Sequence, residues 1–598
     1  MHLNHSPAAR SPVNLILILA CVLLIRLPFL NQAIQGDDHK YLAQAEHAQI
    51  DPLHPNHLHY VFLGDRVDMR GFPHPPFNAW FLAILIAATG DIHEIPFHAA
   101  YLLFSLIAAL AMWSLAKRFS PQPIWAALLF LAVPAFVVNG NSFESDLPFL
   151  AFWMTAIAAF IAEKRRLAAI AAILAALSAF QAIFLTPILA VYVWLNHRHD
   201  RHAWLLTLVA PATIIVWQIW ERLTSGALPV AVAAGYMSSY GLQTLANKLR
   251  NFAALSVHAC FMIFPLLLPP AAIFAWKRRD RDTAFLAAWI VIFFAGAVAV
   301  FFAGSARYLL PMAAPMALLV SRLRTRWLAI GFAAQLALSL SLATVNYQHW
   351  DGYRQFARAI RPSAAGHRVY SNGEWGLRYY LEADGGLPIE RGQILRTGDI
   401  VVTSRLGYPV NFTAPTAPIA HQEIRATLPF QLIGLEARSA YSTDTKGLLP
   451  FDITTAPIDI VDAAIVVDRH PTLSYLPMNA PEAATQIVSG LYDVENGAWR
   501  WMSGAAVVLL KPPAQPMPLE AVFTIPDSAP ARRIELLLDG RVVASQTYPA
   551  PGAYTLRAPA QQPAGPTATV TLTADRTFSV PGDHRDLGVV VSAIGFHP

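Results

Sequence analysis

The chain has 598 residues, of which 55% are hydrophobic and only 14% are charged, and its mean hydropathy is +0.42. Soluble domains carry about 25% charged residues, so this composition excludes an ordinary soluble protein and indicates a polytopic membrane protein. The net charge of +5 arises from basic residues in short clusters between apolar segments. That distribution is typical of topology signals and argues against a nucleic-acid partner.

Apolar segments fill the first part of the chain and stop near Thr344. The first segment follows Arg10 and continues through Pro28 without a small-residue cleavage site, which predicts a retained anchor rather than a signal peptide. Several of the eleven predicted spans are shorter than the ~20 residues of a perpendicular helix. The predicted spans are Asn14–Leu30, Phe97–Ala116, Ile124–Val138, Leu147–Ala162, Leu167–Phe180, Ala182–Leu195, Ala203–Trp220, Phe252–Trp276, Ala284–Phe302, Tyr308–Val320 and Trp327–Thr344.

Basic clusters orient these spans. With Arg10 in the cytoplasm, every second connection should be basic. This alternation of basic and non-basic connections holds only if His74–Thr89 does not cross the membrane. Phe77–Ala88 is therefore predicted to be an interfacial helix within a first outer loop, residues 31–96. The odd number of crossings then places the rest of the chain outside the cytoplasm. The cytoplasmic clusters are Lys117 with Arg118, Lys164–Arg166, Arg198 with Arg201, Lys277–Arg281 and Arg322–Arg326.

The sequence after the last span has a soluble character and divides into two predicted units. Residues 346–480 mix short strands with helical stretches, which favours an α/β domain. Residues 481–598 contain short strands separated by Pro and Gly, which predicts a β-sandwich that could bind carbohydrate. Cys21 and Cys260 fall inside predicted spans, so no disulfide is expected.

Two adjacent carboxylates, Asp37 and Asp38, follow the first span. Charge so close to lipid is uncommon unless it serves a function. One carboxylate could act as a general base for an acceptor hydroxyl, and its neighbour could raise its pKa or hold a metal. The alternative is an exposed acidic loop that keeps this segment outside the membrane.

His74 precedes Pro75 and Pro76 at the start of the predicted interfacial helix. The prolines fix the backbone there, so the imidazole could meet a lipid-borne phosphate at the membrane surface. Equally, the motif could be a helix start with an incidental His. The loop contains further ligand types, but no spacing selects a zinc set. These are His39, His47, His54, His57, His59, Asp51, Asp65 and Asp68.

Three charged residues further along the chain are predicted to lie on the same outer face. Glu144 and Asp146 precede the fourth span and could complete a shared substrate-binding site with Asp37, or Asp146 could simply cap the next helix. Arg307, in SARYLLP, could pair with a phosphate or mark the interface beside Tyr308.

Together, these motifs resemble the GT-C glycosyltransferases. The acidic pair after the first span, the HPP motif before an amphipathic helix, the D-x-P motif before the fourth span and ARYLLPMAAP are similar to family 39 enzymes. That family includes bacterial relatives of protein O-mannosyltransferases and of lipid A aminoarabinose transferases. The resemblance covers Leu15 to about Thr344 and predicts a GT-C-like membrane domain over residues 1–345.

The resemblance implies inverting transfer of a sugar from a polyprenyl-phosphate carrier to a glycan, lipid or protein acceptor on the outer face of the membrane. By this analogy Asp37 is the general base, Asp38 stands where such enzymes usually have Glu, and His74 and Arg307 lie near the carrier phosphate. His74 occupies a position that is Lys in the aminoarabinose branch, so that branch's donor is not implied. The resemblance leaves open whether a divalent metal ion takes part.

Two other functions remain as alternatives: a polytopic transporter, and a membrane protein that binds glycans through its β-sandwich. Charges gathered on one face, without two halves of broken spans, favour the enzyme. High Ala content and the absence of paired cysteines favour a bacterial inner membrane, with the N-terminus cytoplasmic and the C-terminal domains periplasmic or extracellular. The sequence identifies neither the sugar nor the acceptor.

Overall fold

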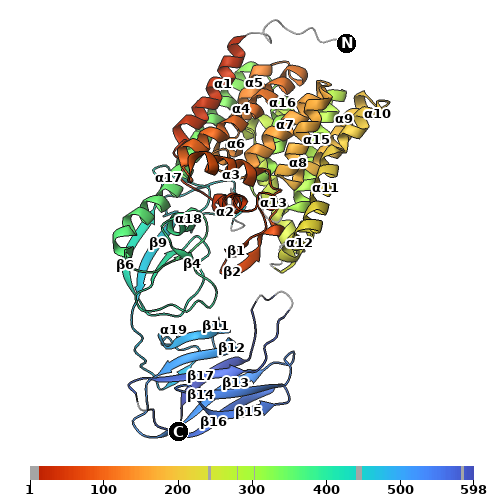
Figure 1. Cartoon of the computed structure of the whole chain (residues 1–598). Coiled ribbons are helices and arrows are strands. Elements are labelled where there is room, and N and C mark those ends of the chain that lie inside the picture. Colours follow the sequence, from red (N-terminus) through yellow and green to blue (C-terminus); the bar gives the residue numbers. More distant parts are fainter. Residues whose placement is uncertain are drawn as a thin grey trace.

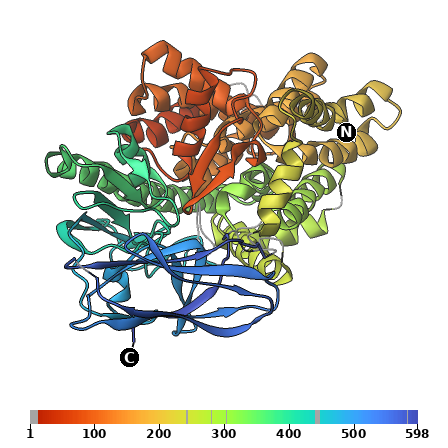
Figure 2. The same ribbon diagram turned by 60° about the horizontal axis from the view of Figure 1, so that its bottom comes forward.

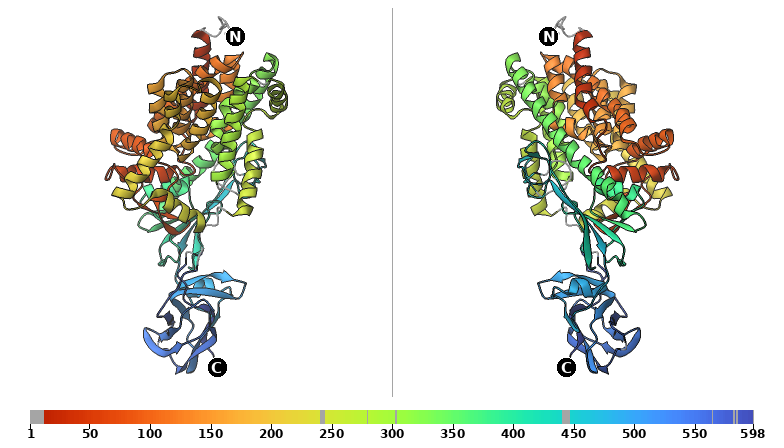
Figure 3. Two further views of the ribbon diagram at one scale, coloured as in Figure 1. Left: turned by 90° about the vertical axis from the view of Figure 1, so that its right-hand side faces the viewer. Right: turned by 90° about the vertical axis from the view of Figure 1, so that its left-hand side faces the viewer.

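The computed structural model describes residues 12–597 except 240–243, 279, 302–303, 440–446, 564, 581–582 and 584. Arg10, Arg279 and Phe302, which the topology prediction uses, lie outside these residues. The protein forms three tiers: a helical bundle, a unit built on a small mixed sheet, and a β-rich unit (Figure 1). The tiers follow one another along the long axis of the molecule, as Figure 3 shows. The predicted order of a helical region followed by α/β and β-rich parts is confirmed.

The bundle consists of apolar helices whose buried faces share one large hydrophobic core. Several helices are broken, and 3₁₀ turns (η) join their parts. In chain order the elements are α1 (Pro12–Arg26), η2 (Leu27–Phe29), α4 (Glu94–Phe119), α5 (Pro123–Leu131), α6 (Pro134–Asn139), α7 (Asp146–Ile161), α8 (Arg165–Ser178), η4 (Phe180–Phe184), α9 (Leu185–Asn196), α10 (Arg201–Thr207), α11 (Val209–Thr224), α12 (Pro229–Ser239), α13 (Leu245–Cys260), η5 (Pro265–Leu267), α14 (Leu268–Lys277), α15 (Arg281–Val300), η6 (Ala306–Leu309), α16 (Leu310–Val320) and α17 (Thr325–Ala364).

Among the described residues, four helices are long and apolar enough to cross a membrane: α1 with η2, α4, α15 and α17. The number rises to six if the bent pairs α10–α11 (43°) and α13–α14 (83°) each form one span. Eleven spans are therefore not confirmed. The difference arises because several predicted spans are short or broken, as at Pro134, where α6 begins after α5 has ended.

The first loop forms its own layer at the end of the bundle that faces the other two units (Figure 1). Its helix α3 begins directly after Pro76 and packs partly against the bundle. The elements of this layer are α2 (Asp38–Ala48), the hairpin β1 (His59–Phe62) and β2 (Asp65–Asp68), η3 (Met69–Gly71) and α3 (Phe77–Thr89).

Helix α17 continues without a break from the bundle into the second unit, so the predicted boundary at residue 345 falls inside a helix. The helix stays regular because its buried stripe keeps the helical period on both sides of that boundary, from Leu342 through His349 and Tyr353 to Ile360. The second unit is thus attached to the bundle by a rigid element rather than by a flexible linker.

The second unit has a five-stranded mixed sheet in the order β4-β3-β5-β9-β6. Strand β3 pairs in parallel with β4 and β5, whereas β9 runs antiparallel to β5 and β6. Helices α17 and α18 pack against this sheet. The bounds are β3 (Val369–Asn372), α18 (Gly376–Ala383), β4 (Leu387–Pro388), β5 (Ile400–Ser404), β6 (Thr416–Ile424) and β9 (Asp459–Val466), with a separate pair β7 (Phe430–Gln431) and β8 (Asp452–Ile453).

The last unit is one nine-stranded antiparallel sheet, not two separate sheets, and it encloses its own apolar core. The two ends of the sheet, β15 and β16, contact each other, so the sheet is rolled up (Figure 2). It already includes Tyr475–Pro477, before the predicted boundary at residue 481. The elements are β10 (Tyr475–Pro477), α19 (Ala483–Gln486), β11 (Ile487–Glu495), β12 (Trp499–Leu510), β13 (Met517–Ile525), β14 (Arg532–Leu538), β15 (Arg541–Tyr548), β16 (Gly552–Gln561), β17 (Ala568–Ala574) and β18 (Val590–Phe596).

Candidate active site

The acidic pair lies at the start of α2. Asp38 is fully buried, and its carboxylate accepts hydrogen bonds from the backbone N–H groups of Gln35 (3.0 Å) and Phe143 (2.7 Å). Asp37 points elsewhere and keeps 23% of its side chain exposed. The two carboxylates therefore differ: Asp38 joins two loops, and Asp37 is the one that remains partly exposed.

The loop between α6 and α7, residues 140–145, carries Glu144 and is followed by Asp146. Arg26, at the end of α1, binds this loop and the helix before it. Its guanidinium donates to the carbonyl oxygens of Phe136 (2.7 Å) and Val137 (2.8 Å) in α6 and to Asn141 Oδ1 (3.0 Å) in the loop. A buried arginine at a helix end is stable only with such partners. The loop is thus held in one conformation from inside the bundle.

Glycine at position 140 fits this support. A Cβ added there would collide with the guanidinium of Arg26. On the other side of the loop, Asn78 donates to the carbonyl oxygen of Phe143 at 2.7 Å, and Tyr101 donates to Asn78 Oδ1 at 2.6 Å. The first loop and two bundle helices therefore fix the acidic loop jointly.

Arg307, in η6, joins the two acidic segments. Its guanidinium contacts Glu144 and lies 3.7 Å from carboxylate oxygens of both Asp37 and Asp146. The ring of Tyr308 covers the cation at 5.2 Å. Arg307 is only 7% exposed, and its Nε has no hydrogen-bond acceptor among the described residues. One buried cation thus faces three carboxylates that are far apart in the sequence.

Lys40 is a second cation at Asp37. Its Nζ lies 2.8 Å from Asp37 Oδ1 and 4.2 Å from the centre of the Phe62 ring in the hairpin. The spacing of three residues on α2 brings the pair together. The backbone N–H of Asp37 also donates to Glu144 Oε1 at 3.3 Å. Asp37 is therefore oriented by contacts from both sides.

The environments shift the pKa values of the two carboxyl groups in opposite directions. Burial raises the pKa of Asp37, but Lys40 and Arg307 outweigh it and hold that pKa well below its usual range. For Asp38, burial dominates over the two backbone donors and raises the pKa well above its usual range. Asp37 is accordingly ionised at neutral pH.

His74 lies beside this group, with its ring against Tyr41 and Phe72 at centroid distances of 5.5 Å. Its Nδ1 is 3.3 Å from the carbonyl oxygen of Ser178, which can only accept, so Nδ1 carries the proton. Burial, with Arg307 nearby, lowers the pKa of His74 to about 4. At neutral pH the ring is uncharged and its Nε2 is an acceptor; the position of His74 near a carrier phosphate stays a prediction.

The other histidines of the first loop do not form a metal centre. No group of three or more His, Cys, Asp or Glu among the described residues is placed to hold a metal ion. His54 instead pairs with Asp51 at 3.0 Å and stacks on Trp220, and His39 faces Glu374 of the second unit at 3.7 Å.

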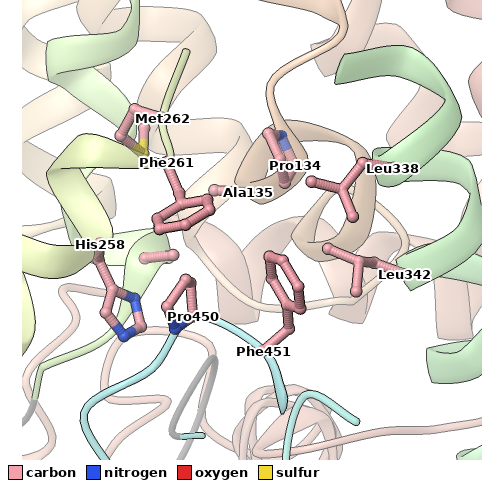
Figure 4. Close-up of a pocket in the computed structure, with 10 residues that line it drawn as sticks. Pro134, Ala135, His258, Phe261, Met262, Leu338, Leu342, Pro450 and Phe451 are labelled. Carbon is pink, nitrogen blue, oxygen red and sulfur yellow. The ribbon is translucent and has the colours of Figure 1, made fainter. Parts of the chain in front are cut away.

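Figure 4 shows a small apolar pocket between Pro134, Phe261 and Leu338. Ala306 of η6 also lines it. The volume of the pocket is only about 10 Å³, and it lies between α6, α13 and α17. The loop of the second unit that carries Pro450 and Phe451 closes one side of it. An apolar space therefore lies one residue away in sequence from the buried cation Arg307.

The sequence did not predict Arg26, Lys40 or, in the second unit, Glu374 as residues of the site. Arg26 could have been found, because a charge at the end of an apolar segment is costly and usually has a structural or functional role. Lys40 stands three residues after Asp37, which is an ion-pair spacing on a helix. Glu374 has no such signal, since only the tertiary structure brings the tail to the first loop.

The comparison with protein families supports one assignment. Residues 73–220, from just before α3 to α11, match the family model described as dolichyl-phosphate-mannose-protein mannosyltransferase. This match, which covers about a quarter of the chain, shows a membrane glycosyltransferase. The resemblance predicted from its motifs is thereby confirmed. A comparison with curated proteins found no significant match.

Solved structures similar to this glycosyltransferase include ArnT from Cupriavidus metallidurans bound to undecaprenyl phosphate, with 13% identity, 75% of this chain and 97% of that chain covered, and a TM-score of 0.43. The arabinofuranosyltransferase AftD from Mycobacteria is 12% identical, with 100% and 61% covered and a TM-score of 0.39. The Pmt1-Pmt2 protein O-mannosyltransferase complex of S. cerevisiae bound to the sugar donor is 10% identical, with 37% and 34% covered and a TM-score of 0.27. These TM-scores lie below 0.5, so the assignment of the glycosyltransferase rests on the family model.

Proposed function

We propose that the protein transfers a sugar from a polyprenyl-phosphate carrier to a hydroxyl of a glycan, lipid or protein acceptor, with inversion at the anomeric carbon. The observation that carries this proposal is the position of Arg307 between Asp37, Glu144 and Asp146. A base that solvent can reach and a buried cation are the two groups that such a transfer requires side by side.

In the proposed reaction, Asp37 takes the proton of the acceptor hydroxyl while the hydroxyl oxygen forms a bond to the anomeric carbon. The bond from that carbon to the phosphate oxygen breaks, and the polyprenyl phosphate leaves with the bonding electrons. Arg307 stabilises the negative charge that grows on the phosphate, with its Nε–H as the free donor. A single displacement of this kind inverts the configuration.

Asp37 suits the role of base because it is the most exposed of the three carboxylates around Arg307. Its side chain is 23% exposed, compared with 3% for Glu144 and 11% for Asp146. Asp38 is a positioning residue in this scheme, because both of its oxygens are bound to backbone N–H groups. His74, as a neutral acceptor, would receive a sugar hydroxyl rather than bind the phosphate.

The site would face the outside of a bacterial inner membrane, which is the side that the basic clusters predict for the first loop. A carrier lipid keeps its chain in the bilayer, and the apolar side chains that line the small pocket beside Ala306 lie close to the site in sequence. A divalent metal is not required by this scheme. The prediction that the last unit binds carbohydrate stays a prediction.

A deletion strain tests the function. Lipid-linked sugars should accumulate when the gene is removed, and these lipids, extracted from that strain, should yield free polyprenyl phosphate when the full-length protein and a membrane extract containing the acceptor are added. A transporter would move the sugar lipid across the membrane and leave its sugar–phosphate bond intact. Unchanged lipid-linked sugars in both measurements would exclude the proposed transfer.

A further inference from the structure

The second unit touches the segment that carries the base. Glu374, between β3 and α18, is 5% exposed, and its Oε2 lies 3.7 Å from Nε2 of buried His39. The other nitrogen of His39, Nδ1, lies 3.2 Å from the carbonyl oxygen of Gly36 and so closes the turn that contains Asp37. A carboxylate of the tail therefore faces the imidazole that fixes this turn.

Glu374 also holds the hairpin of the first loop. Its Oε1 accepts a hydrogen bond from the backbone N–H of Leu63 at 2.8 Å, and its carboxylate pairs with Arg378 of α18 at 3.3 Å. Arg378 donates to the carbonyl oxygen of Val61 and covers the ring of Tyr60 at 4.0 Å. Glu374 and Arg378 of the second unit thus contact both the backbone and the Tyr60 side chain of the hairpin.

The hairpin in turn supports the cation at the base. The ring of Phe62, next to Val61 and Leu63, lies under Nζ of Lys40, which contacts Asp37. A shift of the hairpin would move this ring and with it the lysine. The contacts that link Glu374 to Asp37 therefore run through the hairpin and Lys40, whereas His39 only lies close to both carboxylates.

The backbone at this contact is constrained. Trp375 is buried and has φ +70° and ψ −152°, a conformation that non-glycine residues rarely adopt. Next to it, a Cβ at Gly376 would collide with the carbonyl oxygen of Ile34 in the first loop. Such strain persists only where the surrounding structure fixes it, and it concentrates at functional sites.

We infer that Glu374 is a positioning residue for sugar transfer, and that the second unit is a working part of the active site rather than an appended module. This inference rests on the proposed function. The ion pair of Glu374 with Arg378 and its hydrogen bond from Leu63 N–H keep the hairpin, and through Lys40 the turn at Asp37, in one arrangement. Its loss should therefore act on turnover more than on donor binding.

Glu374→Gln is the informative variant, because glutamine keeps the volume and can still accept from Leu63 N–H, while the charge that pairs with Arg378 is lost. Asp462→Asn is the matched control, since Asp462 lies in the same unit in a pair with Arg405 whose side chains are 35% and 54% exposed. For the lipid-linked sugar extract, Glu374→Gln should lower kcat about 10- to 100-fold with little change in KM. Asp462→Asn should behave as the wild type.

A second readout does not depend on activity. At a temperature where all three proteins remain folded, hydrogen exchange of peptides covering residues 35–40 and 59–68 should be faster in Glu374→Gln than in the wild type and in Asp462→Asn. Wild-type kcat per folded protein together with unchanged exchange would overturn the inference, as would a loss of activity that only follows a lower folded fraction. If the wild type itself releases no polyprenyl phosphate, the proposed function fails, and the exchange data alone decide whether Glu374 positions this loop.

Discussion

Replacing Asp37 by asparagine removes the proposed base and keeps the shape of the side chain. Asn can still accept the hydrogen bond from Lys40 Nζ, now 2.8 Å from Asp37 Oδ1. The change from a charged to a neutral hydrogen bond at a side chain that is 23% exposed should cost only about 1 kcal/mol of stability. A lost general base lowers the rate about 10²- to 10⁴-fold, equivalent to about 3 to 5 kcal/mol in the barrier. The catalytic loss should therefore far exceed the loss of folded protein.

The assay measures polyprenyl phosphate released from lipid-linked sugars extracted from a strain that lacks the protein. Asp51→Asn serves as the matched control, because Asp51 lies in the same loop and is 38% exposed in its pair with His54. Both variants should insert and melt like the wild type, and only Asp37→Asn should lose transfer. If Asp37→Asn and Asp51→Asn release polyprenyl phosphate at the same rate, Asp37 is not the base.

Three further predictions concern charge and orientation. Arg307→Gln should lower kcat about 100-fold, measured by the same release assay, because the leaving phosphate loses its cation. Although burial raises the pKa of Asp37, Lys40 and Arg307 hold it well below its usual range, so the base stays ionised and kcat should not fall between about pH 7 and about pH 5; an acid limb near about pH 6 in the rate profile would indicate a different base. In intact cells, an impermeant thiol reagent should label Ile50→Cys but not Lys164→Cys, since both positions are exposed and lie in loops predicted to face opposite sides.

The motifs of the membrane domain predicted which charged residues lie together, but they did not predict what each carboxylate contacts. Asp37, Glu144, Asp146 and Arg307 were selected because charges are costly near lipid, and the structure brings all four together. The same reasoning treated Asp38 as a partner of the base, yet it is bound to two backbone N–H groups. Sequence spacing cannot distinguish a carboxylate that assists the base from one that is bound to the backbone. The donors to Asp38 come from Gln35 nearby and from Phe143 far along the chain.

Span counting was the weakest part of the sequence reasoning. Hydropathy identifies apolar segments, but it does not show that α5 ends at Leu131 or that α13 and α14 meet at 83°. It also ended the last predicted span at Thr344, whereas α17 continues to Ala364 because its buried stripe persists beyond the apolar run.

Composition, basic clusters and local motifs are properties of the chain, so they were sufficient to predict the class of molecule, the order of its parts and the chemistry available at the acidic pair. Which charges meet depends on the folded structure. Arg307 reaches Asp37 across the bundle, and Glu374 reaches His39 from the second unit. Such partners are selected by the packing of distant elements, and burial then fixes which carboxylate remains free to react.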